Sequence, residues 1–225
     1  MTGRERFEAA LAGRSVAWAP LLWERLPELV RQPAAAWWRD ATVAQRLLAD
    51  AAGVAGADAL FVLAVPGERG GGEDALDALA DGADALAVRE LVGRLRASAP
   101  FAAIAALPDA AALLRDFGAG DPDVAEDALA DLARSLLDAG ADALAVVGDQ
   151  AGESARRVAA IGAFYGRPVL AVEPARAWFE SGSDAPVALV GEDGGWPAAG
   201  LAVTAGDVSA RWDADALRAA GEARP

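Results

Sequence analysis

Acidic residues follow the apolar segments of this chain, and they are its strongest candidates for chemistry. Seven segments with the composition of buried strands lead into carboxylates, at Glu24, Glu68, Asp109, Asp149, Glu173, Glu192 with Asp193, and Asp207. The chain contains no histidine and no cysteine, so any reaction must run on carboxylates, hydroxyls, amines or guanidinium groups. Carboxylates that meet at one opening repel one another unless a cation, a divalent metal or bound protons compensate them.

Asp149 and Glu173 are the best catalytic candidates in this set. They end two apolar segments that are neighbours in the sequence, and the residues after them, Gln150 and Pro174, are typical of shaped turns. Crowding of two carboxylates raises the pKa of one, which gives an acid beside a base, as proton transfer requires. The alternative for each single position is a helix N-cap, because acidic residues favour the N-termini of the helices that follow strands.

The remaining candidates are residues that would bind a ligand. Trp23, Trp178 and Trp196 lie near the same segment ends. They form a stacking wall for a flat or cationic ligand or, equally, are aromatic residues of the core and rim. We expect substrate-binding residues at Trp23, Glu24, Glu68, Asp109, Gln150, Trp178, Glu192 and Asp207. The sequence predicts no cofactor and no metal site. Binding of Mg²⁺ or Mn²⁺ by the carboxylates stays an alternative.

Length, composition and charge narrow the class of protein. A chain of 225 residues with 54% hydrophobic content predicts one domain with a sizeable core. The net charge of −14 repels phosphate backbones and anionic lipids, so neither a nucleic acid nor a membrane is the expected partner. Zinc and iron sites are not expected without cysteine or histidine. Because the N-terminus lacks a signal-peptide core and the apolar stretches are short, we expect a cytoplasmic protein with a small-molecule ligand.

Hydrophobic periodicity predicts strands that alternate with helices. The expected strands are 19–23, 58–65, 101–107, 142–147, 169–172, 187–190 and 201–204. The expected helices are 2–12, with Thr2 and Glu5 as a capping box, and 26–32, 33–53, 109–117, 121–139, 154–165 and 213–220. This alternation implies right-handed crossovers and a parallel sheet covered by helices, either a closed barrel or a doubly wound sheet.

One phrase, Gly-Ala-Asp-Ala-Leu, occurs three times, within 56–62, 82–88 and 140–146. Its glycine fits the left-handed residue that ends a helix, and the apolar residues after it fit a buried strand. The first and third copies therefore predict strands. The middle copy fits a strand or a helix, and we favour a helix because Leu86, Leu91, Val92 and Leu95 share a helical face.

The glycine-rich segment 66–73 is a solvated connector or a mobile lid, since three consecutive glycines, Gly70 to Gly72, make it pliable. It contains no phosphate-binding loop, because neither the Lys-Ser/Thr pair nor the glycine spacing of a dinucleotide-binding turn is present.

The opening residues Met1-Thr2-Gly3-Arg4-Glu5-Arg6-Phe7-Glu8-Ala9-Ala10-Leu11-Ala12-Gly13, with Pro20 ahead of Leu21-Leu22-Trp23, resemble the start of the uroporphyrinogen decarboxylase superfamily. Two later segments are similar in order and spacing: Ala139 to Leu144 leading into Asp149-Gln150-Ala151-Gly152, and Gly206-Asp207-Val208 ahead of Asp213. The resemblance spans most of the chain, and the N-terminal phrase is its specific part. It implies a TIM-type (β/α) barrel over residues 1–225, with seven strands recognised and the eighth missing or supplied by 82–88.

The departures from this family shape the functional expectation. The family's decarboxylases carry Arg-Gln-Ala-Gly-Arg-Tyr after the first strand, whereas Trp23-Glu24-Arg25-Leu26-Pro27-Glu28 stands here and leaves Arg25 as the candidate catalytic arginine. The family's methyltransferases bind zinc through His and Cys, so that activity is not expected. The resemblance implies binding of a small molecule at the C-terminal mouth, with a lyase or decarboxylase step that uses carboxylates and arginine.

The alternative is a non-catalytic family member that acts as a binding or scaffold subunit. The missing eighth strand and the lost arginine motif favour it, whereas the carboxylates at the strand ends favour an enzyme. An incomplete barrel would leave a parallel edge exposed, so a homodimer is also expected.

Overall fold

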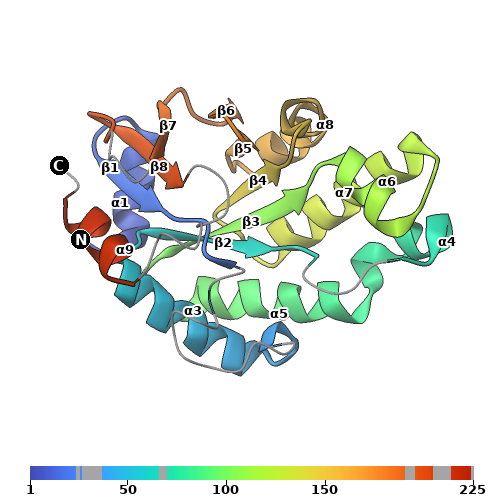
Figure 1. Ribbon diagram of the computed structural model, residues 1–225, viewed down its shortest axis with the longest axis horizontal. Helices are drawn as coiled ribbons and strands as arrows, with labels where there is room; N and C mark the ends of the chain where they lie inside the picture. Colours follow the sequence, from blue (N-terminus) through green and yellow to red (C-terminus); the bar gives the residue numbers. More distant parts are fainter. Residues whose placement is uncertain (24–25, 27–36, 66–69, 191–195, 205–213, 224–225) are drawn as a thin grey trace.

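The structure is a computed structural model that describes residues 1–223 except 24–25, 27–36, 66–69, 191–195 and 205–213. Its strands form two sheets (Figure 1). The larger sheet has the order β2-β3-β4-β5-β6, with strands at Ala59–Leu63, Ala102–Pro108, Ala143–Val147, Val169–Glu173 and Arg176–Ser181. The smaller has the order β1-β8-β7, with strands at Val16–Ala19, Gly200–Thr204 and Val187–Val190. All pairs are parallel except β5 with β6.

Helices connect and cover these strands, so the mixed α/β class is confirmed. The α-helices are α1 at Gly3–Leu11, α3 at Ala41–Ala55, α4 at Gly72–Asp77, α5 at Ala83–Ser98, α6 at Ala110–Phe117, α7 at Pro122–Asp138, α8 at Ala151–Phe164 and α9 at Ala214–Glu222. In the described part of the chain, short 3-10 helices lie at Trp37–Arg39 and Leu79–Asp81. The strand pairing does not close into one sheet, so a TIM-type barrel is not shown by the hydrogen-bond ladders.

The predicted capping box of the first helix is present. The Thr2 hydroxyl accepts a hydrogen bond from the backbone N–H of Glu5, and the Glu5 carboxylate accepts one from the backbone N–H of Thr2. The middle Gly-Ala-Asp copy begins α5, where Val88, Leu91 and Leu95 are buried on one face, so the helix predicted there is confirmed.

Three sequence predictions of the elements were wrong. The described residues form eight strands, and the one that the sequence did not predict is β6; segment 82–88 lies in a helix. The first strand ends at Ala19 instead of beginning there, because Pro20 has no N–H to extend the ladder. In the described part of segment 33–53, the helix begins after the N-cap Asp40, whose carboxylate accepts hydrogen bonds from the N–H groups of Thr42 and Val43.

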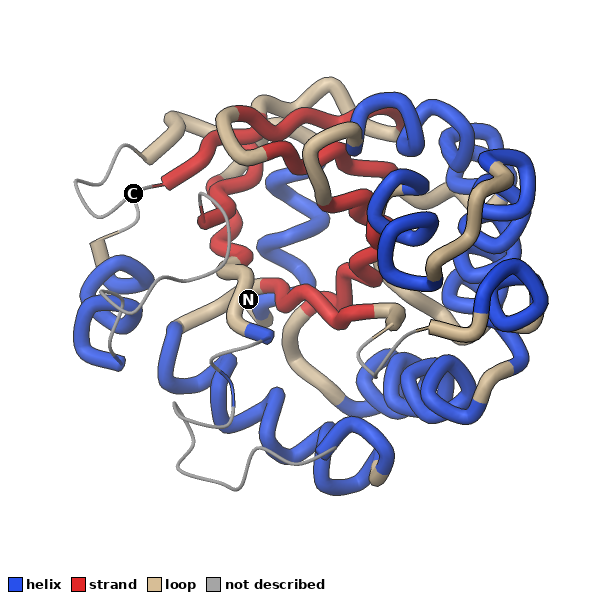
Figure 2. Tube along the Cα trace, turned by 45° about the vertical axis from the view of Figure 1, so that its right-hand side comes forward, coloured by secondary structure: helices blue, strands red, loops and turns tan. Residues whose placement is uncertain are grey.

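One apolar cluster takes residues from every strand of both sheets and from α1. The first inward residue of each of β1 to β4 is an alanine, namely Ala17, Ala59, Ala102 and Ala143. These small side chains leave room for Phe7 of α1, which packs among them and is buried. Figure 2 shows the strands of both sheets arranged around α1. A second cluster fills the layer between the strands and the covering helices.

The two sheets meet between β1 and β2 through Asp58, the aspartate of the first Gly-Ala-Asp copy. The backbone N–H of Asp58 donates to the carbonyl of Trp18 at 2.8 Å, and the N–H of Trp18 donates to the Asp58 carboxylate at 3.1 Å. Nε of Arg6 in α1 donates to the same carboxylate at 2.6 Å. At the other margin, β6 packs beside β7.

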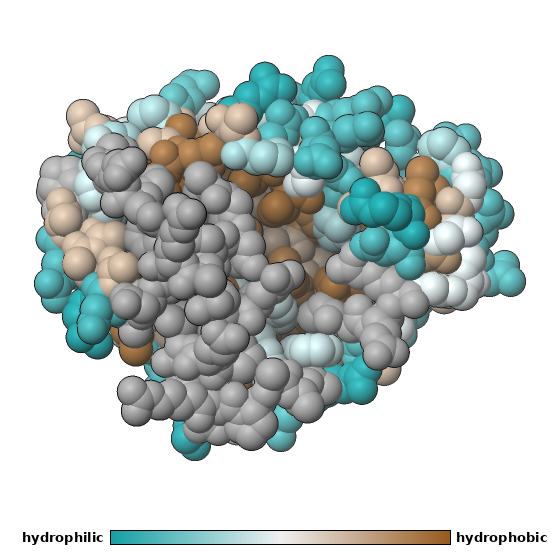
Figure 3. Space-filling model, viewed as in Figure 1, coloured by the Kyte–Doolittle hydropathy of each residue, from teal (hydrophilic) through white to brown (hydrophobic). Residues whose placement is uncertain are grey.

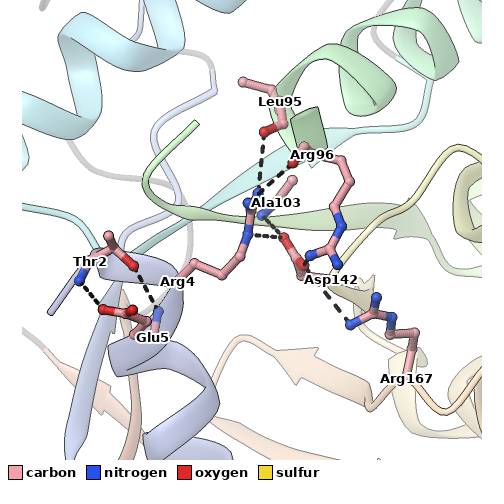
Figure 4. A network of polar contacts seen from close by, with 8 residues as sticks. All are labelled: Thr2, Arg4, Glu5, Leu95, Arg96, Ala103, Asp142 and Arg167. Atoms are coloured by element: carbon pink, nitrogen blue, oxygen red, sulfur yellow. Dashed lines mark hydrogen bonds and ion pairs between the residues drawn. The ribbon is translucent and has the colours of Figure 1, made fainter. Parts of the chain in front are cut away.

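The aspartate of the third copy is held in the same way (Figure 4). Asp142 is buried and accepts hydrogen bonds from Nε of Arg4 at 3.2 Å, Nη1 of Arg96 at 2.7 Å and the backbone N–H of Ala103 at 3.0 Å. The two arginines of the opening phrase therefore each hold the aspartate of one Gly-Ala-Asp copy, and so fix α1 across the N-terminal ends of the strands.

Candidate functional site

An open groove of about 430 Å³ lies between the N-terminal end of α8 and the outer faces of β5 and β6. Its lining residues are Gln150, Gly152, Glu153, Arg156, Glu173, Arg176, Trp178 and Glu180. The groove brings together three of the predicted site residues, Gln150, Glu173 and Trp178. Its volume lies within the range of about 300 to 1,000 Å³ that small-molecule sites occupy.

The β5–β6 hairpin creates this groove. Only Pro174 and Ala175 separate the two strands, a connection too short to hold a covering helix. Ala177 and Phe179 of β6 face the inner cluster. Because side chains alternate along a strand, Arg176, Trp178 and Glu180 face outward beside α8.

Glu173 is engaged by two partners at the edge of the groove. Its Oε2 accepts a hydrogen bond from Nε of Arg176 at 2.7 Å, and its Oε1 accepts one from the backbone N–H of Gly152 at 3.3 Å. The hydrogen bond from Arg176, supported by that from Gly152, lowers the pKa of Glu173, and the pKa of Arg176 is raised in turn. Glu173 is therefore ionised at neutral pH, the opposite of the raised pKa that a proton donor requires.

Trp178 is held from several sides. Its indole Nε1 donates to Oε2 of Glu180 at 3.0 Å, and the guanidinium of Arg176 lies 4.6 Å from its ring centroid. A Cβ atom at position 152 would lie 2.6 Å from Cζ2 of Trp178. The missing side chain of Gly152 is thus what lets the indole lie against α8.

Arg156 is the groove's cation without a carboxylate. Its Nε donates to the carbonyl of Gly152 at 3.1 Å, and among the described residues it forms no ion pair. Its neighbour Arg157 differs, since Nη2 of that residue lies 3.2 Å from Oε1 of Glu126. The terminal nitrogens of Arg156 therefore have no partner among the described residues.

Asp109 and Asp149 do not line the groove. Asp109 is buried as the N-cap of α6, where its carboxylate accepts hydrogen bonds from the N–H of Ala112 at 2.7 Å and the N–H of Gln150 at 2.8 Å. It thereby positions the turn that carries Gln150. Asp149 is exposed in that turn.

The predicted tryptophan wall does not assemble, because each tryptophan contacts a different partner. Trp23 packs against Trp37 with ring centroids 4.6 Å apart, and Trp196 packs against Trp18 at 5.3 Å. Trp178 contacts Arg176. Five further predicted site residues lie outside the described residues: Glu24, Arg25, Glu68, Glu192 and Asp207.

The inner cluster ends on apolar side chains at the carboxyl ends of the strands. Leu63, Val147 and Leu189 belong to this cluster and are only half-buried there. Figure 3 shows apolar side chains recessed near the centre of the face in view. Glu173 follows the inward-facing Val172 and so turns to the outer face, toward the groove.

The described residues contain no group of three or more acidic side chains placed to hold a metal ion. No helix in the described part of the chain is long and apolar enough to cross a bilayer.

Five groove residues were missed by the sequence analysis: Gly152, Glu153, Arg156, Arg176 and Glu180. Two of them, Arg176 and Glu180, flank the apolar run Ala177-Trp178-Phe179, which hides the alternation of a half-buried strand. No signal marked Arg156, because an arginine on an exposed helical face is ordinary.

Comparison with protein-family models and with curated proteins gives no match to this chain. The resemblance to the uroporphyrinogen decarboxylase superfamily therefore depends on the residues quoted for it.

Proposed function

We propose that this protein is a distorted eight-stranded barrel of the uroporphyrinogen decarboxylase type that binds a small polar molecule in the groove between α8 and β6. Three observations support the barrel. One apolar interior takes residues from all eight described strands, Asp58 bonds β1 to β2, and β6 packs beside β7. The antiparallel β6 then takes the place of a helix-covered parallel strand.

The observation that carries the binding proposal is the convergence of Gln150, Glu173 and Trp178 in one groove. They come from three separate segments, the β4–α8 turn, β5 and β6. A groove with an aromatic ring, charged groups of both signs and an amide offers shape together with polar recognition, as ligand sites do.

The proposed role is binding without proton donation by Glu173. A decarboxylation must deliver a proton to the carbon that loses carbon dioxide, and a carboxylate held ionised by Arg176 is a poor donor. A lyase step would need a donor other than Glu173. The engagement of Glu173 with Arg176 favours the second candidate, a non-catalytic family member that binds its ligand unchanged.

A homodimer is a separate proposal. The argument for it is an exposed sheet edge left by a missing eighth strand. That argument is weakened because β6 supplies an eighth strand and lies beside β7. Light scattering of the purified chain tests it: a mass near twice 22.8 kDa supports the dimer, and a mass near 22.8 kDa excludes it.

Native mass spectrometry of the purified chain, after exposure to a metabolite mixture with and without Mg²⁺ or Mn²⁺, tests the binding proposal. We expect the wild type and Asp149→Asn to retain the same molecule, because Asp149 does not line the groove. Trp178→Ala should retain it at least about 10-fold less well, since aromatic contacts dominate small sites. Glu180→Ala, a milder change at the groove edge, gives the same test if Trp178→Ala does not fold.

Retention by Trp178→Ala and Glu180→Ala at the wild-type level would place the ligand elsewhere. A wild type that retains nothing would also overturn the proposal.

A further inference from the structure

We infer that the ligand of this groove is a small zwitterion, with a carboxylate that binds Arg156 and a protonated amine that faces Glu153 and Glu180. This inference rests on the proposed binding function. It adds the chemical class of the ligand, which follows from the charges that the folded chain leaves unpaired.

The groove contains three carboxylates and two guanidinium groups, and only one carboxylate and one guanidinium group bind each other. Glu173 and Arg176 bind each other at 2.7 Å. Glu153 and Arg156 lie three residues apart on α8 and line the same groove, but they form no ion pair with each other or with another described residue. Within the described ranges, Glu180 accepts a hydrogen bond only from the indole N–H of Trp178. One cation and two anions therefore remain for a ligand.

Arg156 is oriented to hold a carboxylate. Its Nε is fixed by the carbonyl of Gly152 at 3.1 Å, which restrains the planar guanidinium and leaves the two terminal nitrogens. Two terminal nitrogens in one plane match the two oxygens of a carboxylate, and such charge-assisted pairs are stronger than neutral hydrogen bonds. Most described arginines of this acidic chain reach a carboxylate, and of the three that do not, Arg14, Arg89 and Arg156, only Arg156 lines the groove.

The charge of the whole molecule argues against a purely anionic ligand. A chain with a net charge of −14 repels anions over its entire surface, so an anion gains little from one arginine. A zwitterion has no net charge to repel. Its ammonium group also compensates Glu153 and Glu180, which both line a groove with one excess negative charge.

Three probes that share a five-carbon chain test this class directly: 5-aminovalerate, valerate and pentylamine. Isothermal titration calorimetry on the wild-type chain should give the tightest binding for 5-aminovalerate. Loss of either charged group should weaken binding at least about 10-fold, which corresponds to about 1.4 kcal/mol. Equal affinity for the three probes, or tighter binding of valerate, would overturn the inference.

Neighbouring arginines give a matched pair of variants. Arg156→Ala should abolish the preference for 5-aminovalerate over pentylamine, whereas Arg157→Ala should keep it, because Arg157 pairs with Glu126 outside the groove lining. Glu153→Gln should reduce the preference over valerate. If Arg157→Ala has the larger effect, Arg156 is not the carboxylate site.

The two proposals fail in distinguishable ways. A neutral molecule that the wild type retains in a Trp178-dependent manner would overturn the zwitterion and leave the binding function in place. A wild type that retains no molecule and binds none of the three probes overturns both.

Discussion

Replacing Asp58 by alanine tests how the two sheets are joined, because the side chain of Asp58 bonds α1 and β1 at once. The carboxylate is fully buried and accepts hydrogen bonds from Nε of Arg6 at 2.6 Å and the N–H of Trp18 at 3.1 Å. Asp58→Ala removes both bonds and leaves the N–H of the buried Trp18 without its carboxylate partner. Breaking a buried ion pair costs about 3 to 5 kcal/mol.

The lower end of that range applies here, because Arg6 is 28% exposed and can turn to water once its partner is removed. We therefore expect a loss of about 3 kcal/mol in the free energy of unfolding. For a chain of this size, that loss lowers Tm by roughly 6 to 12 °C. Urea unfolding followed by tryptophan fluorescence measures the free energy of unfolding, and thermal unfolding followed by circular dichroism measures Tm.

The middle Gly-Ala-Asp copy supplies the control. Asp84 also pairs with an arginine, Arg39, at 2.7 Å, but the two side chains are 24% and 61% exposed. Asp84→Ala should cost less than about 1 kcal/mol, as exposed pairs do. Hydrogen exchange at the Trp18 amide should speed up in Asp58→Ala only. Equal losses in the two variants would refute the view that Asp58 joins the sheets.

Three further predictions concern the groove and the core. Gly152→Ala should destabilise the chain and weaken ligand binding, because its Cβ would lie 2.6 Å from Trp178. The control Gly53→Ala in α3, whose Cβ would meet no atom within 4 Å, should be neutral or stabilising in thermal unfolding. Since the pKa of Glu173 lies below its ordinary value of 4.5, its ion pair stabilises the fold above that pH and is lost as the pH falls through the lower folded pKa. Wild type and Glu173→Gln should therefore differ in Tm at neutral pH and converge in acid, and a difference that persists in acid would contradict this. Phe7→Ala should cost about 3 to 5 kcal/mol in urea unfolding, because the alanines around Phe7 cannot fill the space, and a loss below about 1 kcal/mol would show that they can.

Much of the fold was predictable wherever a local rule decides the structure. The capping box of Thr2 and Glu5 depends on residues three apart, and it is present as predicted. The spacing of apolar residues, which is also a local property, separates the three Gly-Ala-Asp copies. The middle copy continues into a face of Val88, Leu91 and Leu95 at helical spacing, whereas the other two lead into continuous apolar runs.

The β6 strand was not predicted because its sequence does not show the alternation of inward-facing and outward-facing residues. Ala177 and Phe179 face inward, but Trp178 lies between them on the outer face and gives the segment the appearance of a continuous apolar stretch. Only the pairing with β5, across the two-residue connection of Pro174 and Ala175, shows which face is which. The groove was missed with the strand, since its walls are the outer residues of β6.

Carboxylates at the ends of strands are a weak sign of function because helices need them. Asp109 uses its two oxygens for backbone N–H groups of α6 and of the next turn, and Asp40 and Asp121 cap α3 and α7 in the same way. Any chain of alternating strands and helices acquires such residues through capping alone. The informative side chains are those that folding leaves unpaired among the lining residues of a groove. By that criterion Arg156, which lies beside a closed Glu173–Arg176 pair and has no carboxylate among the described residues, says more about the ligand than the acidic residues do.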